Sequence, residues 1–412
     1  MTSSDSSNTT HSLDYHLGVP ENQADELMFP ALNAIRDNDP VFWSEANDAW
    51  ILTKHEHIMS AFKDHRYSSA GSFLFGMERY VDLAKVPNLV KYSRNWLINM
   101  DGEDHRRIRK ALMPVFSRAS IDKYIPLIEA VVTELVDEIA KKGEVDYVVD
   151  VAYQLPARVI TAILGLERKH LDDIKRWSDI LVITVLPQNF SEENLLLGER
   201  CMAEMNELLL AEMKERSAQP REDLLTDFVR LVDSGALSLD EALATLQIVL
   251  VAGHDTTANS NVLALQALLK HPAQMTYFRA NIDRAFEFMP ELMRYTSMSA
   301  TQFRIALEDI ELEGKTIKKG DFILLSLAAA HRDSTKFKSA ETLDLTNDST
   351  GHLTFAPGFH FCLGHYLARL ELSIFFKHLL QYFDHIFIPE QKTEQNGNFV
   401  FRGIQHLQVK FS

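Results

Sequence analysis

The chain has 412 residues and a formal net charge of −16, from 58 acidic and 42 basic side chains. This acidity argues against general binding to nucleic acid or to anionic membranes. With 46% hydrophobic and 24% charged residues, the composition is that of a globular protein with a large core. The two cysteines, Cys201 and Cys362, provide no disulfide framework and suit a reducing cytoplasm. We interpret Cys201, in a helical stretch, as a core residue.

The beginning of the chain predicts neither a signal peptide nor a membrane anchor. Residues 1–12 are rich in Ser and Thr and lack an apolar segment, and no run of about 20 apolar residues occurs in the chain. We expect a disordered tail over residues 1–15 and a single domain over residues 16–412. We also expect a cytoplasmic protein.

In chain order, hydrophobic periodicity predicts many helices and a few short strands. A helix over 22–37 precedes strands over 41–43 and 49–52 and a helix over 56–62. Residues 67–99 show no clean period, and their large apolar residues either form a lid or belong to the core: Phe73, Phe75, Tyr80, Tyr92 and Trp96. Further helices are predicted over 101–116, 121–142, 149–164, 168–182, 192–217 and 224–232.

The next predicted element is the longest helix. It starts with the capping box Ser238-Leu239-Asp240-Glu241 and ends at Lys270, because Pro272 follows. A helix over 283–295, strands over 303–306, 310–312, 315–317 and 322–326, and a helix over 365–380 complete the pattern. The segment around Pro187-Gln188-Asn189 is either a substrate lid or a surface connection.

Residues 355–364 form a Gly- and Pro-containing loop before the last helix. Cys362 lies where that helix begins, so backbone N–H groups and the positive helix end favour a thiolate. Such a thiolate is a nucleophile or a metal ligand, although a lone cysteine is often only a small buried hydrophobe. Gly358 and Gly364 flank the sulfur and allow a flat ligand to approach.

The loop residues Phe355, Gly358, His360, Cys362 and Gly364 fit the spacing F-x-x-G-x-H-x-C-x-G. This pattern resembles the haem-binding loop of the cytochrome P-450 superfamily, in which the cysteine sulfur is the axial ligand of the haem iron. The resemblance implies a mostly α fold with small β-sheets, the P-450 fold, and haem b (iron protoporphyrin IX) as cofactor. Ala356 stands where Gly is most frequent, and Phe359 stands where Pro or a small residue is common.

Two further regions resemble haem-binding parts of that superfamily. His105 and Arg109 lie four residues apart on one predicted helix, which on its own suggests a solvated face. Beside the cysteine loop this run is similar to the family's H-x-x-x-R helix, which implies that both residues bind a haem propionate. Arg304 resembles a second propionate donor.

The centre of the longest helix reads Ala252-Gly253-His254-Asp255-Thr256-Thr257, although its surroundings are apolar. A Thr hydroxyl there competes for backbone carbonyls, and Gly permits close approach of a ligand. This hexapeptide resembles the family's A-G-x-D/E-T motif beside the distal haem face. The resemblance implies that Ala252 contacts the haem and that Asp255 and Thr256 deliver protons; otherwise these residues are structural. We interpret His254 as packing or bonding to backbone.

Glu291 and Arg294 are spaced as an i, i+3 helix pair. Such a pair on a surface adds little stability. About 70 residues before Cys362, however, it resembles the family's E-x-x-R pair, which implies a buried salt-bridge network. The segment after it, 331–337, is similar to the family's N-R-D-P-x-x-F. Asn347 stands where the family's F-D-x-x-R segment has Arg, which leaves open how the network is completed.

The resemblance implies a monooxygenase that inserts one oxygen atom from O2 into a small, largely apolar or aromatic molecule, as expected in secondary metabolism. Residues 399–407 resemble the terminal hairpin that closes the substrate pocket. Family position predicts this pocket lining: Ile248, Val251, Ala252, Thr256, Met298, Ala300, Thr301 and Val400.

The chain carries no flavin, nicotinamide or iron–sulfur motif, so its electrons must come from a ferredoxin or similar donor with its reductase. We expect the donor to dock at the basic residues Arg106, Arg107 and Lys110. We further expect a monomer without nucleic-acid or membrane partners.

Two kinds of alternative remain open from the sequence. Oxidative coupling, dealkylation or desaturation would use the same residues with a different substrate pose, whereas a peroxide-driven enzyme would not need the Asp255–Thr256 pair. A haem-thiolate sensor of gases or ligands belongs to another class, and the regulatory or DNA-binding segment that it would need is not evident.

Overall fold

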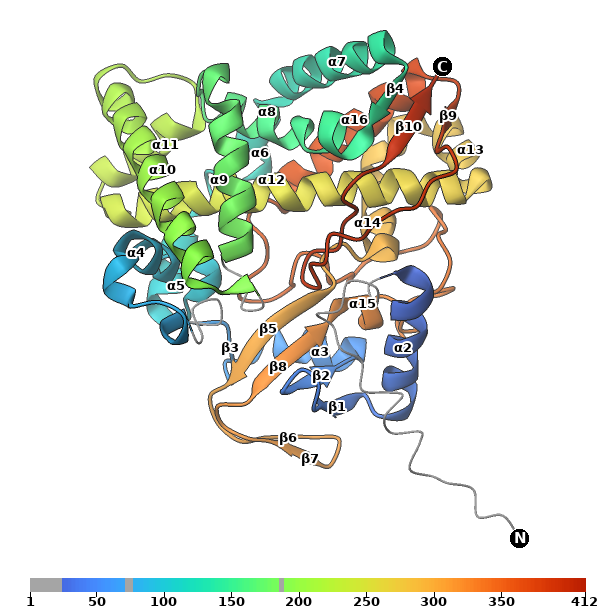
Figure 1. The fold of residues 1–412 in the computed structure, drawn as a ribbon, viewed down its shortest axis with the longest axis horizontal. Coiled ribbons are helices and arrows are strands. Elements are labelled where there is room, and N and C mark those ends of the chain that lie inside the picture. Colours follow the sequence, from blue (N-terminus) through green and yellow to red (C-terminus); the bar gives the residue numbers. More distant parts are fainter. Residues whose placement is uncertain (1–23, 71–76, 185–188) are drawn as a thin grey trace.

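A computed structural model describes residues 24–70, 77–184 and 189–412. Three expectations fall outside these residues: the disordered tail, the lid aromatics Phe73 and Phe75, and positions 187 and 188 of the second candidate lid. The described residues form a large helical layer beside a smaller region of sheet (Figure 1).

The helical layer surrounds one long helix, α12 (Leu239–Lys270), which crosses the middle of the molecule (Figure 1). Its 32 residues span about 48 Å. The predicted capping box is present, with Ser238 and Glu241 each bonding to the other's backbone N–H. The other helices of this layer are α4 (Pro87–Arg94), α5 (Gly102–Leu112), α6 (Arg118–Asp122), α7 (Ile125–Lys142), α8 (Gln154–Ile163), α9 (Leu171–Thr184), α10 (Glu192–Ala218), α11 (Leu224–Asp233), α13 (Pro272–Ala280), α14 (Ala285–Thr296) and α16 (His365–Tyr382).

The sheet region is built from segments far apart in the sequence. Its largest sheet has the order β1-β2-β8-β5-β3, in which β2 and β8 are parallel and the other pairs are antiparallel. The strands are β1 (Val41–Ser44), β2 (Ala49–Leu52), β3 (Tyr67–Ser68), β5 (Thr301–Ala306) and β8 (Phe322–Ser326), accompanied by helices α2 (Asp25–Asn38), α3 (His55–Ala61) and α15 (Leu327–Ala330). Smaller sheets pair β6 (Ile310–Leu312) with β7 (Lys315–Ile317), and β10 (Gln408–Phe411) with β4 (Glu144–Asp146) and β9 (Ile386–Phe387).

The predicted fold class is confirmed, and the corrections concern local boundaries. The region 67–99 contains the helix α4, which starts at Pro87, and Pro272 begins α13 as well as ending α12. In both helices proline occupies the first turn, where no backbone N–H is needed. The stretch 121–142 divides into α6 and α7, and 149–164 divides into a π-helix (Tyr147–Ala152) and α8.

Aromatic residues of the irregular region behave as core rather than as a lid. Of the three that the structure describes, Tyr92 and Trp96 are buried in the main hydrophobic cluster and Tyr80 is exposed. Cys201 is also fully buried, on α10, as expected.

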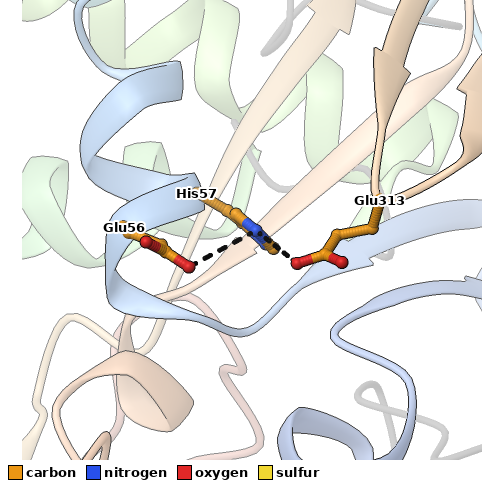
Figure 2. Close-up of side chains that lie close together, drawn as sticks. All are labelled: Glu56, His57 and Glu313. Carbon is orange, nitrogen blue, oxygen red and sulfur yellow. Dashed lines mark ion pairs between the residues drawn. The ribbon is translucent and has the colours of Figure 1, made fainter. Parts of the chain in front are cut away.

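An ion-pair cluster ties α3 to the β6–β7 hairpin (Figure 2). His57 Nε2 lies 3.2 Å from Glu313 Oε1 and 3.9 Å from Glu56 Oε1. Burial lowers the pKa of His57, so its ring is neutral near pH 7. Lys54 Nζ, 3.0 Å from Glu313 Oε1, supplies the positive charge opposite this carboxylate.

Among the described residues, no helix is both long enough and apolar enough to cross a membrane.

Candidate functional site

The cysteine loop joins the end of the sheet region to α16. Cys362 N donates to Phe355 O at 3.0 Å, which closes the loop, and its sulfur is exposed to an internal cavity. Backbone N–H groups of Gly364 and His365 and the charge of Arg109 favour the thiolate, as expected, but burial outweighs them and raises the pKa of the Cys362 thiol. Ionisation of this sulfur is therefore favoured only when a metal ion takes it as a ligand.

Two loop positions adopt backbone conformations that favour glycine. Gly358 has φ +143°, and a Cβ there would lie 2.1 Å from the carbonyl oxygen of Phe62. Its glycine thus serves a close approach between two backbone segments, whereas we had expected it to make room for a ligand. Ala356 has φ +49°, in the left-handed region, which costs an L-residue about 1–2 kcal/mol.

The cavity, of about 300 Å³, lies between α12 and the cysteine loop and is mostly apolar. α12 contributes Ala252, Gly253 and Thr256, while the loop and α16 contribute Cys362 and Gly364. The other lining residues include Leu97, Ile98, Phe116, Pro156, Val159, Ile160, Thr245, Ile248, Val249, Met293, Met298, Ser299, Gln302, Phe355, Leu367, Glu371 and Phe401.

One part of the cavity wall is rich in N–H donors. His105, Arg109, Arg304 and His360 all line it. His105 Nε2 is buried without a hydrogen-bond partner among the described residues, and burial lowers the pKa of this ring to about 4. Burial also lowers the pKa of Arg304 to about 10. A neutral imidazole N–H and two guanidinium groups in one buried wall suit a ligand with anionic acceptor atoms.

His360 belongs to the same wall but is held by the protein itself. Its Nε2 lies 3.1 Å from Asp101 Oδ1 and 2.9 Å from Ser69 Oγ, and its ring centre is 4.3 Å from that of His105. Burial opposes ionisation of Asp101, but hydrogen bonds from His360 and Ser68 outweigh it and keep the pKa of this carboxyl well below its usual range. Asp101 therefore orients His360 beside His105.

The predicted proton-delivery residues face opposite sides of α12. Thr256 lines the cavity, and its Oγ1 donates to Ala252 O at 2.6 Å. Asp255 does not line the cavity; its Oδ1 accepts a 3.0 Å hydrogen bond from Tyr153 Oη. Burial raises the pKa of Asp255 to about 6. His254 is fully buried, with Nε2 3.0 Å from Tyr153 O, which confirms that it bonds to backbone.

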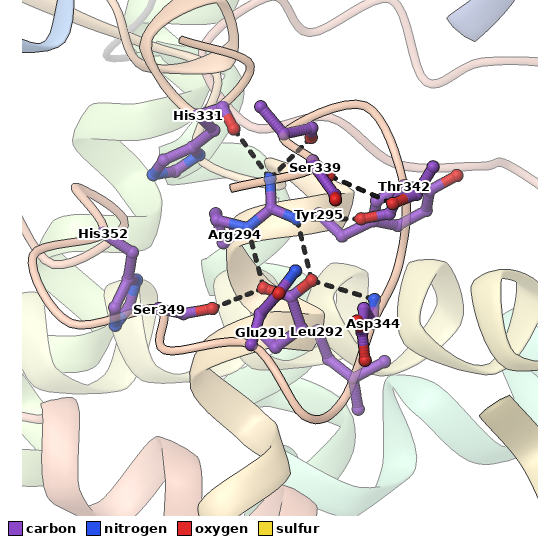
Figure 3. Close-up of polar contacts among 12 residues, drawn as sticks. Glu291, Leu292, Arg294, Tyr295, His331, Ser339, Thr342, Asp344, Ser349 and His352 are labelled. Carbon is purple, nitrogen blue, oxygen red and sulfur yellow. Dashed lines mark hydrogen bonds and ion pairs between the residues drawn. The ribbon is translucent and has the colours of Figure 1, made fainter. Parts of the chain in front are cut away.

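The Glu291–Arg294 pair forms a buried network (Figure 3), as predicted. Arg294 Nε and Nη2 donate to Glu291 at 2.7 and 2.8 Å. Arg294 also donates to three backbone carbonyls, those of His331, Ala340 and Thr342. The two side chains are 2% and 1% exposed, which excludes the surface-pair alternative.

The same network shows how the chain manages without the arginine that Asn347 replaces. Ser349 Oγ donates to Glu291 Oε2, and Asp344 N donates to Glu291 Oε1 at 3.1 Å (Figure 3). Asn347 lies outside this network and donates to Lys338 O. A hydroxyl and a backbone N–H thus take the place of a second guanidinium.

The C-terminal segment closes one side of the cavity. Arg402 N donates to Met298 O at 2.8 Å, and Ala300 N donates to Val400 O at 2.9 Å. Arg402 Nη1 donates to Thr296 O at 2.7 Å, and Nη2 donates to Asp25 of α2. In place of a regular hairpin, this segment has isolated bridges at Ser299–Phe401 and Gln395–Ile404.

Four residues predicted for the substrate pocket lie outside its lining: Val251, Ala300, Thr301 and Val400. All four are buried in packing with neighbouring elements, and Phe401 presents its side chain to the cavity instead of Val400. Ile248, Ala252, Thr256 and Met298 do line it. Backbone direction, which sequence position alone does not give, decides which neighbour faces inward.

Comparison with known proteins agrees with this arrangement of cysteine loop and long helix. The family model "Cytochrome P450" matches residues 43–411. The chain belongs to the cytochrome P-450 family.

Relatives with known names support the assignment. The chain is 30% identical over 373 residues to both "Cytochrome P450 107B1" and 6-deoxyerythronolide B hydroxylase of Saccharopolyspora erythraea, covering 88% of this chain and 89% and 90% of theirs. A solved structure of P450BioI in complex with hexadec-9Z-enoic acid ligated acyl carrier protein is similar, with a TM-score of 0.85 and 27% identity over 95% of this chain and 100% of that one. The chain is therefore a P-450 monooxygenase, an oxidoreductase that binds haem iron.

The residues present fit the haem of a P-450. Cys362, whose sulfur reaches the cavity, would hold the iron, and His105 Nε2, unpartnered among the described residues, would bind the haem carboxylates together with Arg109 and Arg304. Arg109 also donates to Phe361 O, which joins α5 to the cysteine loop. Phe355, Ala252 and Gly364 of the predicted set also line the cavity, whereas Gly358 does not.

The predicted docking residues of this P-450 differ in how closely their charges are paired with carboxylates. Arg106 and Lys110 are exposed. Arg107 donates to Glu241 at the start of α12 and lies 3.5 Å from Asp104. Arg107 therefore ties α5 to α12, and its charge is largely compensated.

Three functional positions were missed from the sequence. Tyr153, which binds Asp255, lies about 100 residues away from it; Asp101 directly precedes the His105 helix; and Glu371 lies nine residues after Cys362. Of these three residues, only Glu371 could have been predicted to lie at the cavity, because its spacing from Gly364, Leu367 and Ala368 places it on the same helix face.

Proposed function

We propose that this P-450 hydroxylates a small, largely apolar molecule that carries a polar group, with haem b as cofactor. The observation that carries the proposal is the apolar cavity between α12 and Cys362, with few polar side chains. Gln302 and Ser299, whose side chains lie 3.4 Å apart, are among them. We infer that they orient a carbonyl or hydroxyl of the substrate. One relative is, by its name, a hydroxylase of 6-deoxyerythronolide B, which agrees with hydroxylation as the reaction.

Haem b fits the donor groups of the cavity wall because it carries two carboxylates. His105, Arg109 and Arg304 are the donors, and His360, held by Asp101, supports His105. Bound through Cys362, haem would supply the chemistry that activates O2, the source of the oxygen atom that enters the substrate.

Two residues of the chain deliver the protons that the reaction consumes. We assign Thr256 the role of the last donor, because its hydroxyl lies in the cavity wall. We assign Asp255 the role of replenishing Thr256, because a buried carboxyl with a pKa of about 6 both holds and releases a proton near neutral pH. Thr256→Ala should divert reducing equivalents to peroxide, and Asp255→Asn should slow turnover, with haem binding unchanged in both.

Electrons come from a separate donor, and we propose a ferredoxin-like protein with its reductase. The exposed Arg106 and Lys110 favour an acidic partner on this face.

A metabolite library screened by haem spectral shift, followed by mass spectrometry of the products, tests the proposal. An apolar ligand that displaces the iron-bound water and gains one oxygen atom supports hydroxylation. A product that gains no oxygen favours coupling, dealkylation or desaturation. Ligands that bind but never support O2 consumption would indicate a sensor. Gln302→Leu should weaken binding of the hit while leaving its apolar analogue unaffected.

A further inference from the structure

Tyr153 holds Asp255 from the side of α12 that faces away from the cavity. Tyr153 lies between the π-helix (Tyr147–Ala152) and α8, and its Oη donates to Asp255 Oδ1 at 3.0 Å. Asp255 Oδ2 is buried and has no hydrogen-bond partner among the described residues. The neighbouring Thr256 lines the cavity, whereas Asp255 does not. The Asp255 carboxyl is therefore held away from the cavity, where the Thr256 hydroxyl, to which it should pass a proton, lies.

The position of Tyr153 is fixed at a second point on α12. His254 Nε2 lies 3.0 Å from Tyr153 O, and the two rings meet edge to face with centres 5.3 Å apart. Burial lowers the pKa of His254 to about 4, so this contact stays neutral at physiological pH. Burial and the adjacent charge of Asp255 raise the pKa of Tyr153 well above its ordinary value, so its phenol remains a donor.

Two charged residues of α9, Lys175 and Asp179, lie on the solvent side of Tyr153 and Asp255. Lys175 Nζ is 5.8 Å from the centre of the Tyr153 ring. The negative charge of Asp179, an exposed residue, raises the pKa of Asp255, whereas the hydrogen bond from Tyr153 lowers it. Groups in mutual contact thus run from the solvent-exposed side of α9 to Tyr153, and from Tyr153 to Asp255 on α12.

We propose that Tyr153 is the positioning residue of Asp255 in this chain: the hydrogen bond from its phenol keeps the carboxyl on the side of α12 away from the cavity and thereby limits how readily the acid serves Thr256. This proposal rests on the proposed role of Asp255. The proton balance is simple: Asp255 gives a proton to the Thr256 hydroxyl, which passes its own into the cavity. Asp255 then regains a proton from water at the Asp179 and Lys175 surface. Tyr153 neither gains nor loses a proton over the cycle.

The test uses Tyr153→Phe, with Tyr147→Phe as a matched control. Tyr147 is the first residue of the π-helix that Tyr153 follows, is fully buried, and donates its hydroxyl to Asn261 of the same α12. Infrared titration of the resting ferric protein, with the Asp255 band identified by its loss in Asp255→Asn, should show a higher pKa for Asp255 in Tyr153→Phe. The pKa should stay as in wild type in Tyr147→Phe.

Turnover supplies the second measurement. If release from Tyr153 limits proton delivery, Tyr153→Phe should lower the solvent isotope effect toward unity at retained coupling, and Tyr147→Phe should not. An unchanged Asp255 pKa together with an unchanged isotope effect would overturn the proposal. If Tyr153→Phe fails to fold, 3-fluorotyrosine at position 153 takes its place: it keeps the ring and makes the phenol a stronger donor, so it should lower the Asp255 pKa, and no shift there would overturn the proposal. Wild-type coupling and rate in Asp255→Asn would instead refute the proposed proton role itself.

Discussion

Removal of Arg294 provides the sharpest test of how this P-450 is held together. Arg294→Ala removes five hydrogen bonds, two to Glu291 and three to backbone carbonyls. Glu291 would remain buried as an anion with only Ser349 and the Asp344 N–H as donors. Breaking a buried pair costs about 3–5 kcal/mol. Since whole proteins are stable by about 5–15 kcal/mol, we expect little folded holoprotein.

Glu291→Ala should be less severe, because the stranded guanidinium keeps three carbonyl acceptors. The assay is urea unfolding, together with the ratio of haem absorbance to protein in the purified variants. Arg284→Ala is the matched control: Arg284 and Glu287 form an i, i+3 pair 2.8 Å apart, but both are exposed, so its midpoint should stay unchanged. If Arg294→Ala matched this control in midpoint and haem content, the reasoning about the network would be wrong.

Four further predictions follow from the site. Cys362→His should abolish the red-shifted Soret band of the ferrous carbon monoxide complex, and an unshifted band in the wild type would contradict thiolate ligation. The double variant Arg106→Glu/Lys110→Glu should slow ferredoxin-driven but not dithionite reduction, with the difference vanishing near 1 M salt, where the Debye length is about 3 Å; wild-type rates at low salt would move the docking site elsewhere. Ala356→Gly should raise stability by about 0.5–1 kcal/mol by relieving its positive φ, whereas Ala328→Gly in α15 should lower it; a loss at position 356 would refute the strain argument. Burial raises the pKa of Glu371 to about 8 from 4.5, so the folded state binds the extra proton and stability should fall by up to about 5 kcal/mol between pH 4.5 and 8; Glu371→Gln should flatten that slope in thermal melts, and an equal slope in both proteins would show that Glu371 is ionised when folded.

The parts of the fold that the sequence predicts are those governed by local rules. The start of α12 follows from the Ser238–Glu241 capping box, and α16 follows from its apolar face after the cysteine loop. α4 was missed because residues 67–99 show no clean hydrophobic period, and α13 was missed because Pro272 was read only as the end of α12; each proline occupies the first turn of a helix. The division at Tyr124 between α6 and α7 depends on packing, which no periodicity encodes.

The candidate site divides along similar lines. Motif spacing identified Cys362, Thr256 and the Glu291–Arg294 pair, because each function needs a fixed residue type at a fixed separation. The partners of these residues come from distant segments: Ser349 binds Glu291 across 58 positions, and Tyr153 binds Asp255 across 102. Contacts made by tertiary packing have no local pattern, so only the structure gives them.

The link from Arg402 to Asp25 has a consequence for the amino-terminal end of this P-450. Arg402 holds the backbone beside Met298 and Phe401, which line the cavity, and its outer contact is the first residue of α2. Arg402 thus links α2 to the cavity wall. Proteolytic trimming or a fusion partner at α2 should therefore disturb the residues that line the cavity. We therefore expect sequence changes in α2, far from Cys362 along the chain, to alter which molecules the cavity accepts.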